Sequence, residues 1–548
     1  MIRHILRKDW TLLWPLVALV TAIQVGFEWA TFKAGFFSDN PVARELVGLL
    51  SAAWTVGVLA VAVAVVHEDP IPGAEQDWLI RPLSRADLLL AKLAFVAISV
   101  CVPMLVVNLT HALALGFPLG LSVSIALYKE LFVFACLLVP VMALAAVARN
   151  MSELLVFGAC LVVLYAAALS VSALTLGSSG CPTCDTSIVW TQHLLQHVGV
   201  LAGAIVILVL QYFRRRTELS RAVAVVGVLM LVSLQLPWRL AFAAQRWMTG
   251  APDAAISASI AVDVAMVQAG LADPASDSDS ASRRSNPRRG ATQALMSGDV
   301  GAAVESLQHV SHPHDAPVAL RIPLRLGGLT PDEFLFADRT QVSVSDDRGR
   351  VLYRGSSARG TFALIPDPNA GQEPGLVQQP VELPRPLYGA ARTRSLGIAL
   401  EYSLTLMAAG ARHRISAVDG ELRTPETGLC RTRAMANEIL MVCKQLGRAP
   451  VCYGATLYAP DGRHNPEVLQ CTPDYRPYLP SLGNILTVSA VELPTHDASG
   501  LAHYSVGGSE LSNAYVELRT YAPRAHFTRS VPVFRFQTAA PVSTDAQR

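Results

Sequence analysis

The stretch EDPIPGAEQDWLIRPLSRADLLLAK, Glu68 to Lys92, holds acids, arginines, prolines and a tryptophan between two long apolar runs. A charged, proline-containing interruption of this kind is typical of a loop between membrane-spanning helices. The runs on either side, residues 46–66 and 93–116, are long enough to cross a bilayer, which takes ~20 residues. The number and spacing of such runs decide the fold.

Seven apolar segments that can span a bilayer occur before about residue 240, and the chain is polar after it. They are Leu12–Ala30, Leu46–Val66, Leu93–Gly116, Leu131–Val147, Leu154–Leu176, Val198–Phe213 and Ala222–Trp238. We therefore predict a polytopic α-helical membrane domain of about seven spans over residues 1–240, with the lipid bilayer as its first partner.

The distribution of basic residues predicts the orientation of these spans. The loops on the N-terminal side hold eleven: Arg3, Arg7, Lys8, Arg81, Arg85, Lys92, Arg149, Arg214, Arg215, Arg216 and Arg221. The loops on the other side hold three before the last span: Lys33, Arg44 and Lys129. Short cytoplasmic loops carry an excess of Lys and Arg, so we predict a cytoplasmic N-terminus. An odd number of crossings then places residues 241–548 on the opposite side.

The polar half of the chain indicates a linker followed by a β-rich domain. Asp273–Gln293 is rich in Ser, Asp and Arg and poor in apolar residues, so we expect 241–315 to be a partly disordered linker. From Val318 onward, apolar and polar residues alternate in VALRIPLRL and in QVSVSDDRGRVLYRG, which also contains a turn at Asp346–Gly349. Further strand candidates are TFALIP, SLGIALEYSLTL, CYGATLYAP, LTVSAVEL, AYVELRTYA and VPVFRFQ. We predict one or two β-sandwiches over residues 316–548.

Cysteine usage indicates an oxidising compartment for this half. Six of the nine cysteines fall in regions predicted to lie outside: Cys181, Cys184, Cys430, Cys443, Cys452 and Cys471. Disulfides persist in such compartments, and an even number of thiols can all pair. We predict disulfides among the last four, with no connectivity fixed by the sequence. The expected location is the inner membrane of a bacterium, with the C-terminal domain in the periplasm.

Two groups of residues have side chains that can bind a metal. Cys181 and Cys184 form a C-x-x-C pair, followed by His193 and His197 one helical turn apart. They make either a disulfide or a tetrahedral zinc site, or remain ordinary thiols beside histidines. The run HVSHPHD gathers its polar residues in either a metal site or a solvated loop: His309, His312, His314 and Asp315.

A few polar residues lie inside the predicted spans. Gln24 and Glu28 are an i, i+4 pair in the first span, and Asn108 and His111 lie in the third. A polar or ionisable side chain at membrane depth lines a path or a helix interface. The alternative for Glu28, which adjoins Trp29, is a place in the outer headgroup layer.

The opening stretch resembles the permease subunits of type-2 ABC exporters. In that family an interfacial N-terminal helix precedes the spans, and the loop after the second span carries an acidic residue, a Gly and a Leu-rich patch that ends in Pro-x-Ser-Arg-x-x-Leu-x-x-x-Lys. The matching positions here are Glu68, Gly73, Leu79, Pro82, Ser84, Arg85, Leu88 and Lys92. MIRHILRKDWTLLWP corresponds to the interfacial helix, and the resemblance covers residues 1 to about 215. The run GAEQDWLI, a seventh span and a large C-terminal domain depart from the family pattern.

The resemblance implies that the 68–92 loop docks into a cleft of a separate ATPase. Pro82 ends what precedes it and Ser84 is a helix N-cap, while Trp78, Arg81 and Arg85 flank the docking helix. The alternative is that Arg81, Arg85 and Lys92 only anchor the third span, with Trp78 at headgroup level.

ATP and Mg²⁺ are expected on the partner, because a phosphate-binding loop needs Gly-Lys-Ser/Thr and this chain has no Gly-Lys pair. We therefore expect no enzymatic activity in this chain. Since six spans form half a pathway in this family, the resemblance also implies a homodimer or a sister permease.

These observations lead to two hypotheses about function. The first is the membrane subunit of an ATP-driven exporter whose external domain receives or gates cargo. The second is a non-transporting anchor that displays a periplasmic β-sandwich for sensing or assembly. The net charge of +2 gives no indication of a nucleic-acid partner.

Overall fold

A computed structural model describes most of the helices and strands of the chain. The described residues are 2–34, 41–68, 84–176, 189–233, 238–249, 256–263, 318–330, 332–356, 362–364, 376–425, 427–435, 438–446, 452–460, 462, 464, 467–471, 486–494 and 511–536. The chain divides into two compact units. The first comprises Met1–Ser178, Ile188–Pro237 and Gly410–Ala522, and the second Ser179–Ser187, Trp238–Ala409 and Pro523–Arg548.

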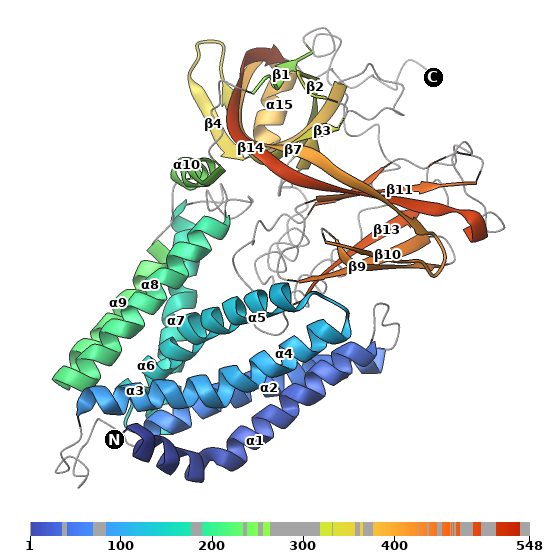
Figure 1. Cartoon of the computed structure of the whole chain (residues 1–548). Coiled ribbons are helices and arrows are strands. Elements are labelled where there is room, and N and C mark those ends of the chain that lie inside the picture. The colour runs from blue at the N-terminus through green and yellow to red at the C-terminus, as the bar shows by residue number, and fades with distance from the viewer. Residues whose placement is uncertain are drawn as a thin grey trace, which may run out of the picture. The chain divides into compact units, whose positions relative to one another are not determined.

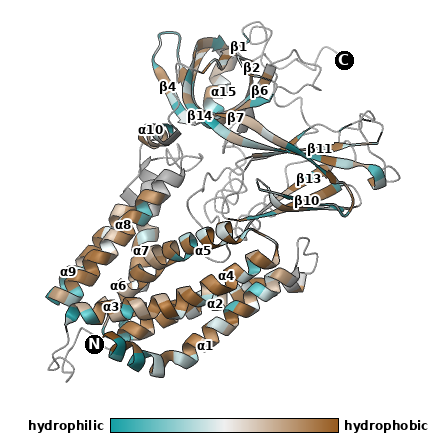
Figure 2. Ribbon diagram, viewed as in Figure 1, coloured by the Kyte–Doolittle hydropathy of each residue, from teal (hydrophilic) through white to brown (hydrophobic). Residues whose placement is uncertain are grey.

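Long apolar helices form the first part of unit 1 (Figures 1 and 2). They are α1 (Ile2–Ala34), α2 (Pro41–His67), α3 (Arg85–Val96), η2 (Ala97–Cys101), α4 (Val102–Ala114), α5 (Leu119–Val133), η3 (Phe134–Leu138), α6 (Val139–Val147), α7 (Met151–Leu176), α8 (Val189–Val209), η4 (Leu210–Arg214) and α9 (Thr217–Ser233). Within the described residues, six continuous helices are long and apolar enough to cross a membrane. The prediction of several membrane-spanning helices is confirmed at this level.

The side chains of these helices are apolar on faces that no protein covers. On α7, Leu155, Val162 and Val163 are each about two-thirds exposed, whereas Val61 and Val65 of α2 are completely buried. Contiguous exposed apolar surface of this kind marks a membrane-facing or binding surface. Exposed apolar faces are typical of helices that cross a membrane.

Two of the long helices widen into a π-turn just before a proline. Pro103 is the second residue of α4 after η2, and Pro140 is the second residue of α6 after η3. Proline inside a helix lacks an N–H and clashes with the carbonyl four residues earlier. A wider turn at that point lets the helix continue. Both helices therefore run on through their prolines.

Three predicted boundaries were wrong. The predicted third span extends back to Arg85. The predicted fourth span extends back to Leu119, so Lys129 lies within a helix rather than an outer loop and is 1% exposed. The segment expected as a separate interfacial helix is part of α1, which is continuous through Pro15.

The strands of unit 2 form two layers around one core. The smaller layer is the antiparallel sheet β1-β2-β6, with β1 (Ser259–Val262), β2 (Val318–Gly327) and β6 (Leu376–Leu383). Alternate residues Leu320, Ile322 and Leu324 of β2 enter the core, where they cluster with Ile398 and Phe527 of the larger sheet. The helix α15 (Arg385–Thr393) contributes to the same core. The prediction of a mainly-β C-terminal part is confirmed, and its sheets are antiparallel.

A seven-stranded sheet has the order β12-β11-β14-β7-β3-β4, with β5 paired to β3. Its strands are β3 (Glu333–Ser345), β4 (Val351–Ser356), β5 (Phe362–Leu364), β7 (Leu396–Ser416), β11 (Cys452–Tyr458), β12 (Val468–Cys471) and β14 (Tyr515–Phe536). β7 and β14 continue from one unit into the other. β14 contains both AYVELRTYA and VPVFRFQ, which we had expected to be separate strands.

A four-stranded sheet, β13-β10-β9-β8, completes the β structure of unit 1. Its strands are β8 (Glu421–Thr424), β9 (Gly428–Ala434), β10 (Glu438–Leu446) and β13 (Leu486–Pro494). Met441 and Val491 of this sheet share a core with Leu457 and Leu518 of the seven-stranded sheet. Unit 1 therefore also has a two-layered β core.

The structure describes the predicted Asp346–Gly349 turn and the beginning of the segment expected as a linker. The Asp346–Gly349 turn is confirmed, with Gly349 at φ +77° and the Asp346 carboxylate accepting from the N–H of Arg350 at 2.8 Å. The segment expected as a linker contributes most of α10 (Trp238–Thr249) and all of β1. Residues 264–315 lie outside the described residues, together with His309, His312, His314 and Asp315.

A buried polar group lies in the core of unit 2. The hydroxyl of Thr405 is hydrogen-bonded to the Asp338 carboxylate and lies 2.6 Å from Nδ1 of His526. Asp338 is the extra residue at a bulge in β3, between the paired positions 337 and 339. Phe242 of α10 packs edge-on against the His526 ring. The bulge turns a carboxylate into the core, where the hydroxyl satisfies it.

Because of the buried group formed by Asp338, Thr405 and His526, we predict that unit 2 loses stability in mild acid. Burial lowers the pKa of the His526 imidazole from 6.5 to about 4. The unfolded chain therefore takes up a proton at His526 before the folded chain does, and stability falls as the pH drops from about 6.5 to about 4. The folded-to-unfolded ratio should fall by up to about tenfold per pH unit in this window. Thermal melts of wild type and H526Q test this, because H526Q should lose that slope, and an equal slope in both would contradict it.

Candidate functional site

Ser84 is where the description of the 68–92 segment resumes after Glu68. It is the N-cap of α3, with extended backbone and a side-chain oxygen that accepts from the Asp87 N–H at 3.0 Å. A serine cap followed by an acidic residue in the first turn satisfies the free N–H groups and favours the helix dipole. The predicted cap is confirmed.

Arg85 joins the start of α3 to the end of another long helix. Its Nη1 donates to the carbonyl oxygen of Phe213 at 2.7 Å. Phe213 lies in η4, which ends at Arg215 in the left-handed conformation, at φ +53°. A cation at a helix C-terminus is favoured by the exposed carbonyl groups. Arg85 thus links α3 to the α8–η4 helix.

Lys92 joins α3 to α1 through a buried ion pair. Its ammonium lies 3.2 Å from Oδ1 and 3.1 Å from Oδ2 of Asp9, and both residues are 0% exposed. Trp10 and Phe95 make an edge-on ring contact next to this pair. Lys92 therefore lies inside the bundle, two turns into α3, rather than in a loop at the membrane surface. The first two turns of α3 hold both α1 and α8.

The rest of the predicted coupling loop is only partly described. Glu68 is exposed at the end of α2, and its N–H donates to the Ala64 carbonyl. Gly73, Trp78, Arg81 and Pro82 lie outside the described residues. Docking of this loop on an ATPase stays a prediction.

A second group of polar side chains lies between α1, α4 and α5. Glu28 and His111, from two different helices, are 4% and 6% exposed, and Oε2 of Glu28 lies 2.6 Å from Nδ1 of His111. The ring of Phe32 packs edge-on against His111. The structure therefore buries Glu28 at an interface between helices. Its depth in a bilayer stays a prediction.

Asn108 extends this group to α5. Its Nδ2 donates to Oε1 of Glu130 at 3.0 Å, and Nζ of Lys129 lies 3.5 Å from its Oδ1. Lys129 also interacts electrostatically with both Glu28 and Glu130. We call Glu28, Asn108, His111, Lys129 and Glu130 the polar cluster. It brings together the two pairs of polar residues that the sequence indicated, except for Gln24, which is buried elsewhere on α1.

Sequence analysis missed Lys129 and Glu130 as candidates. They are adjacent charges within the otherwise apolar run LGLSVSIALYKELFVFACLLVP. The sequence prediction places Lys129 in an outer loop and begins the next span at Leu131. The apolar residues before them, from Leu119 on, are the signal that could have placed both inside a helix.

The turn between α4 and α5 contacts the β structure of unit 1. Leu115 and Leu429 belong to one apolar cluster, and Nη1 of Arg423 in β8 donates to the Leu115 carbonyl at 2.7 Å. Gly116 has φ +82°, and a Cβ there would lie 2.0 Å from the Arg423 guanidinium. Only glycine fits this turn without displacing the arginine.

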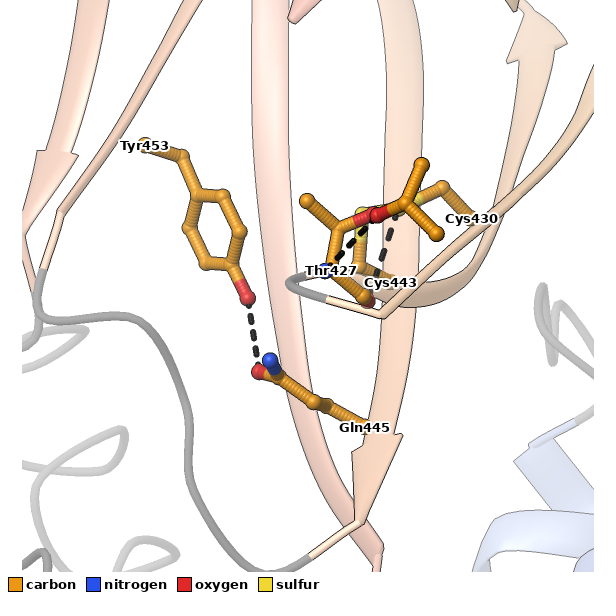
Figure 3. Close-up of a disulfide and its surroundings, with 6 residues drawn as sticks. Thr427, Cys430, Cys443, Gln445 and Tyr453 are labelled. Carbon is orange, nitrogen blue, oxygen red and sulfur yellow. Dashed lines mark hydrogen bonds between the residues drawn. A yellow bond between two sulfur atoms is a disulfide. The ribbon is translucent and has the colours of Figure 1, made fainter. Parts of the chain in front are cut away.

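One predicted disulfide is present between two neighbouring strands (Figure 3). Cys430 of β9 and Cys443 of β10 face each other in the ladder and are bonded, and both are buried. Next to them, the Tyr453 hydroxyl donates to Gln445 Oε1 at 2.9 Å. Cys452 is also disulfide-bonded, and its partner position across the β11–β12 ladder is Cys471.

The predicted zinc or disulfide site falls mostly outside the described residues. This applies to Cys181, Cys184 and the side chain of His193. His197 is half-buried in α8, where its ring packs against Phe132. In the part of the chain that the structure describes, no group of His, Cys, Asp and Glu is arranged to hold a metal ion. Zinc binding stays a prediction.

Comparison with known protein families and with characterised proteins found no match to this chain.

Proposed function

We propose that the chain is the permease subunit of an ATP-driven ABC exporter, coupled to a separate ATPase through residues 68–92. The observation that carries this proposal is the attachment of the start of α3. Arg85 holds it to η4 and Lys92 holds it to α1. A displacement of the loop would therefore pass to three helices at once, since packed helices and buried ion pairs transmit strain.

The partners follow from the same proposal. The chain has no Gly-Lys pair, so ATP and Mg²⁺ would be bound by the ATPase subunit. Since the resemblance to type-2 exporters covers six spans, a second permease copy or a sister permease would complete the pathway.

The proposed orientation has a cytoplasmic N-terminus, seven spans and a periplasmic C-terminal domain in a bacterial inner membrane. The basic run Arg214–Arg216 is exposed at the same end of the helices as Ser84, which favours that end as the cytoplasmic one. The β structure contacts the α4–α5 turn, at the opposite end of the α3–α4 helix. The Cys430–Cys443 disulfide supports an oxidising compartment for that side.

The seventh span is assigned to α9. This helix has 17 residues, which gives ~25 Å of length, against ~30 Å for the hydrocarbon core of a bilayer. Bilayer thinning at the site can accommodate the difference. Labelling residue 1 and a cysteine introduced by V533C, at an exposed position of β14, from each side of the membrane tests the parity: the two should react from opposite sides, and reaction from one side would contradict seven crossings.

Exchanging the loop arginines should uncouple the chain from its ATPase. We expect the purified complex from native membranes to hydrolyse Mg-ATP, and R81E/R85E to reduce the co-purifying activity at least about tenfold, as loss of a ~1.4 kcal/mol contact does. R216E is the matched control, since it makes the same change at an exposed arginine beside η4. Undiminished activity in R81E/R85E would contradict the coupling role, and a complex without any ATPase would favour a non-transporting anchor for the β domain.

A further inference from the structure

The polar cluster plays no part in the attachment of α3, and its hydrogen bonds are incomplete. Three polar atoms in it have no hydrogen-bond partner among the described residues: Oε1 of Glu28, Nε2 of His111 and Oε2 of Glu130. The three side chains that carry them are at least nine-tenths buried. A buried carboxylate oxygen without a donor is costly, since water no longer solvates it. The two carboxylate oxygens therefore lack a donor, and the imidazole of His111 can take up a proton.

The formal charges lead to the same conclusion. Glu28 and Glu130 carry one negative charge each and Lys129 one positive charge, so the cluster is at −1 when His111 is neutral. One added proton makes it neutral. An unbalanced charge buried among helices is strongly disfavoured, and a proton is the smallest ligand that removes it.

Among the side chains that the structure describes, few other charged groups face this pair. From α5 they are Lys129 and Glu130, and from η2 it is Cys101, which interacts with Glu130. On α2, Glu45 is exposed.

The Glu28–His111 contact fits an added proton best. The 2.6 Å between Oε2 and Nδ1 is the separation of a short, charge-assisted hydrogen bond. Glu130 by comparison already accepts from Asn108 and lies near Lys129. Glu28 is therefore the carboxylate in direct contact with the His111 ring, whereas Glu130 already has another hydrogen-bond donor.

We propose that Glu28 and His111 form a proton-binding site within the helical bundle. One proton from water adds to the His111 ring, and the product is an imidazolium paired with the Glu28 carboxylate. The proton comes from a hydronium ion, whose O–H bond breaks as the N–H bond forms, and one water molecule is released. The bound proton neutralises the polar cluster and holds α1 against α4. This site belongs to the helices themselves and does not depend on coupling to an ATPase.

The direct test is ¹⁵N NMR of the full chain with labelled histidine, in lipid nanodiscs, over a pH titration. H111Q identifies the His111 signal by its loss. We expect wild type to show an imidazolium at His111 that deprotonates as the pH rises. E28Q should weaken proton binding by about a hundredfold, the usual effect of removing an opposite charge at this distance. His111 neutral throughout the folded range, or an unchanged titration in E28Q, would overturn the proposal.

Two further variants keep the test decisive. H111Q retains an amide donor for Glu28 but cannot take up the proton, so it should lose the part of the stability that rises as the pH falls, up to about tenfold in folded-to-unfolded ratio per pH unit. S122A, at a buried serine of α5, should keep that pH dependence. If E130Q abolishes the titration and E28Q does not, the proton is on Glu130 and the assignment to His111 is wrong.

Discussion

Replacing Lys92 by methionine should destabilise the helices of unit 1 by about 3–5 kcal/mol. The substitution fills the volume of the side chain but leaves the Asp9 carboxylate buried without its ammonium partner, both residues being 0% exposed in the intact protein. A buried charge deprived of its counter-ion is among the most destabilising single changes. Equilibrium unfolding in mixed micelles, followed by helical circular dichroism, measures the effect.

The double variant D9N/K92M is the matched control. Removing both charges takes away the carboxylate that has lost the Lys92 ammonium, so most of the lost stability should return. If K92M alone were as stable as wild type, the ion pair would not hold α1 to α3. Such a result would also remove the structural basis for transmission from the 68–92 loop.

Removing the Cys430–Cys443 disulfide should cost about 3 kcal/mol of local stability, because it closes a loop of ~15 residues. The bond joins β9 to β10 across a sequence separation of 13. The C430A/C443A variant should exchange the amide hydrogens of Gly428–Leu446 much faster, while those of α2 should be unchanged. Hydrogen exchange with mass spectrometry resolves the two regions.

The control for this variant uses thiols that the structure shows unbonded. Cys101 and Cys136 are free, so C101A/C136A should leave exchange in β9 and β10 as in wild type. Equal exchange rates in C430A/C443A and wild type would contradict a stabilising role for the disulfide. Both variants leave the strand sequence otherwise intact.

Local sequence signals predicted the parts of the fold that local physics decides. Ser84 was predictable as a cap because a serine precedes a Leu-rich run with Asp87 in its first turn. Hydropathy predicted the long helices because a bilayer requires apolar residues on every side. Alternation predicted β2, whose Leu320, Ile322 and Leu324 are all completely buried.

The missed elements are those that partners far away in the sequence decide. β10 was not predicted, because EILMVCKQL shows little alternation of apolar and polar residues. It is an inner strand of its sheet, paired with β9 on one edge and β13 on the other. β14 was split in two because Pro523 lies within it, between the two predicted strands. Lys129 and Glu130 were not recognised as part of a helix, because the residues that they contact, Glu28 and Asn108, come from α1 and α4.

In the candidate sites too, the sequence identifies single residues, whereas their partners depend on the fold. Glu28 and His111 were each identifiable as polar residues within apolar spans, but the pairing of the two depends on the packing of α1 on α4. Arg85 was identifiable from its place after the cap, whereas its acceptor, the Phe213 carbonyl, carries no sequence signal. Backbone acceptors are common to every residue, so only the fold selects one.

The passage of β7 and β14 from unit 1 into unit 2 sets a limit on dissection of the protein. The boundaries fall at residues 409–410 and 522–523, inside both strands. A truncation there would cut two adjacent central strands of the seven-stranded sheet and leave unpaired backbone groups at the break. Recombinant fragments that end at these positions should therefore aggregate, and a soluble piece for crystallisation has to retain Leu396–Ser416 and Tyr515–Phe536 whole.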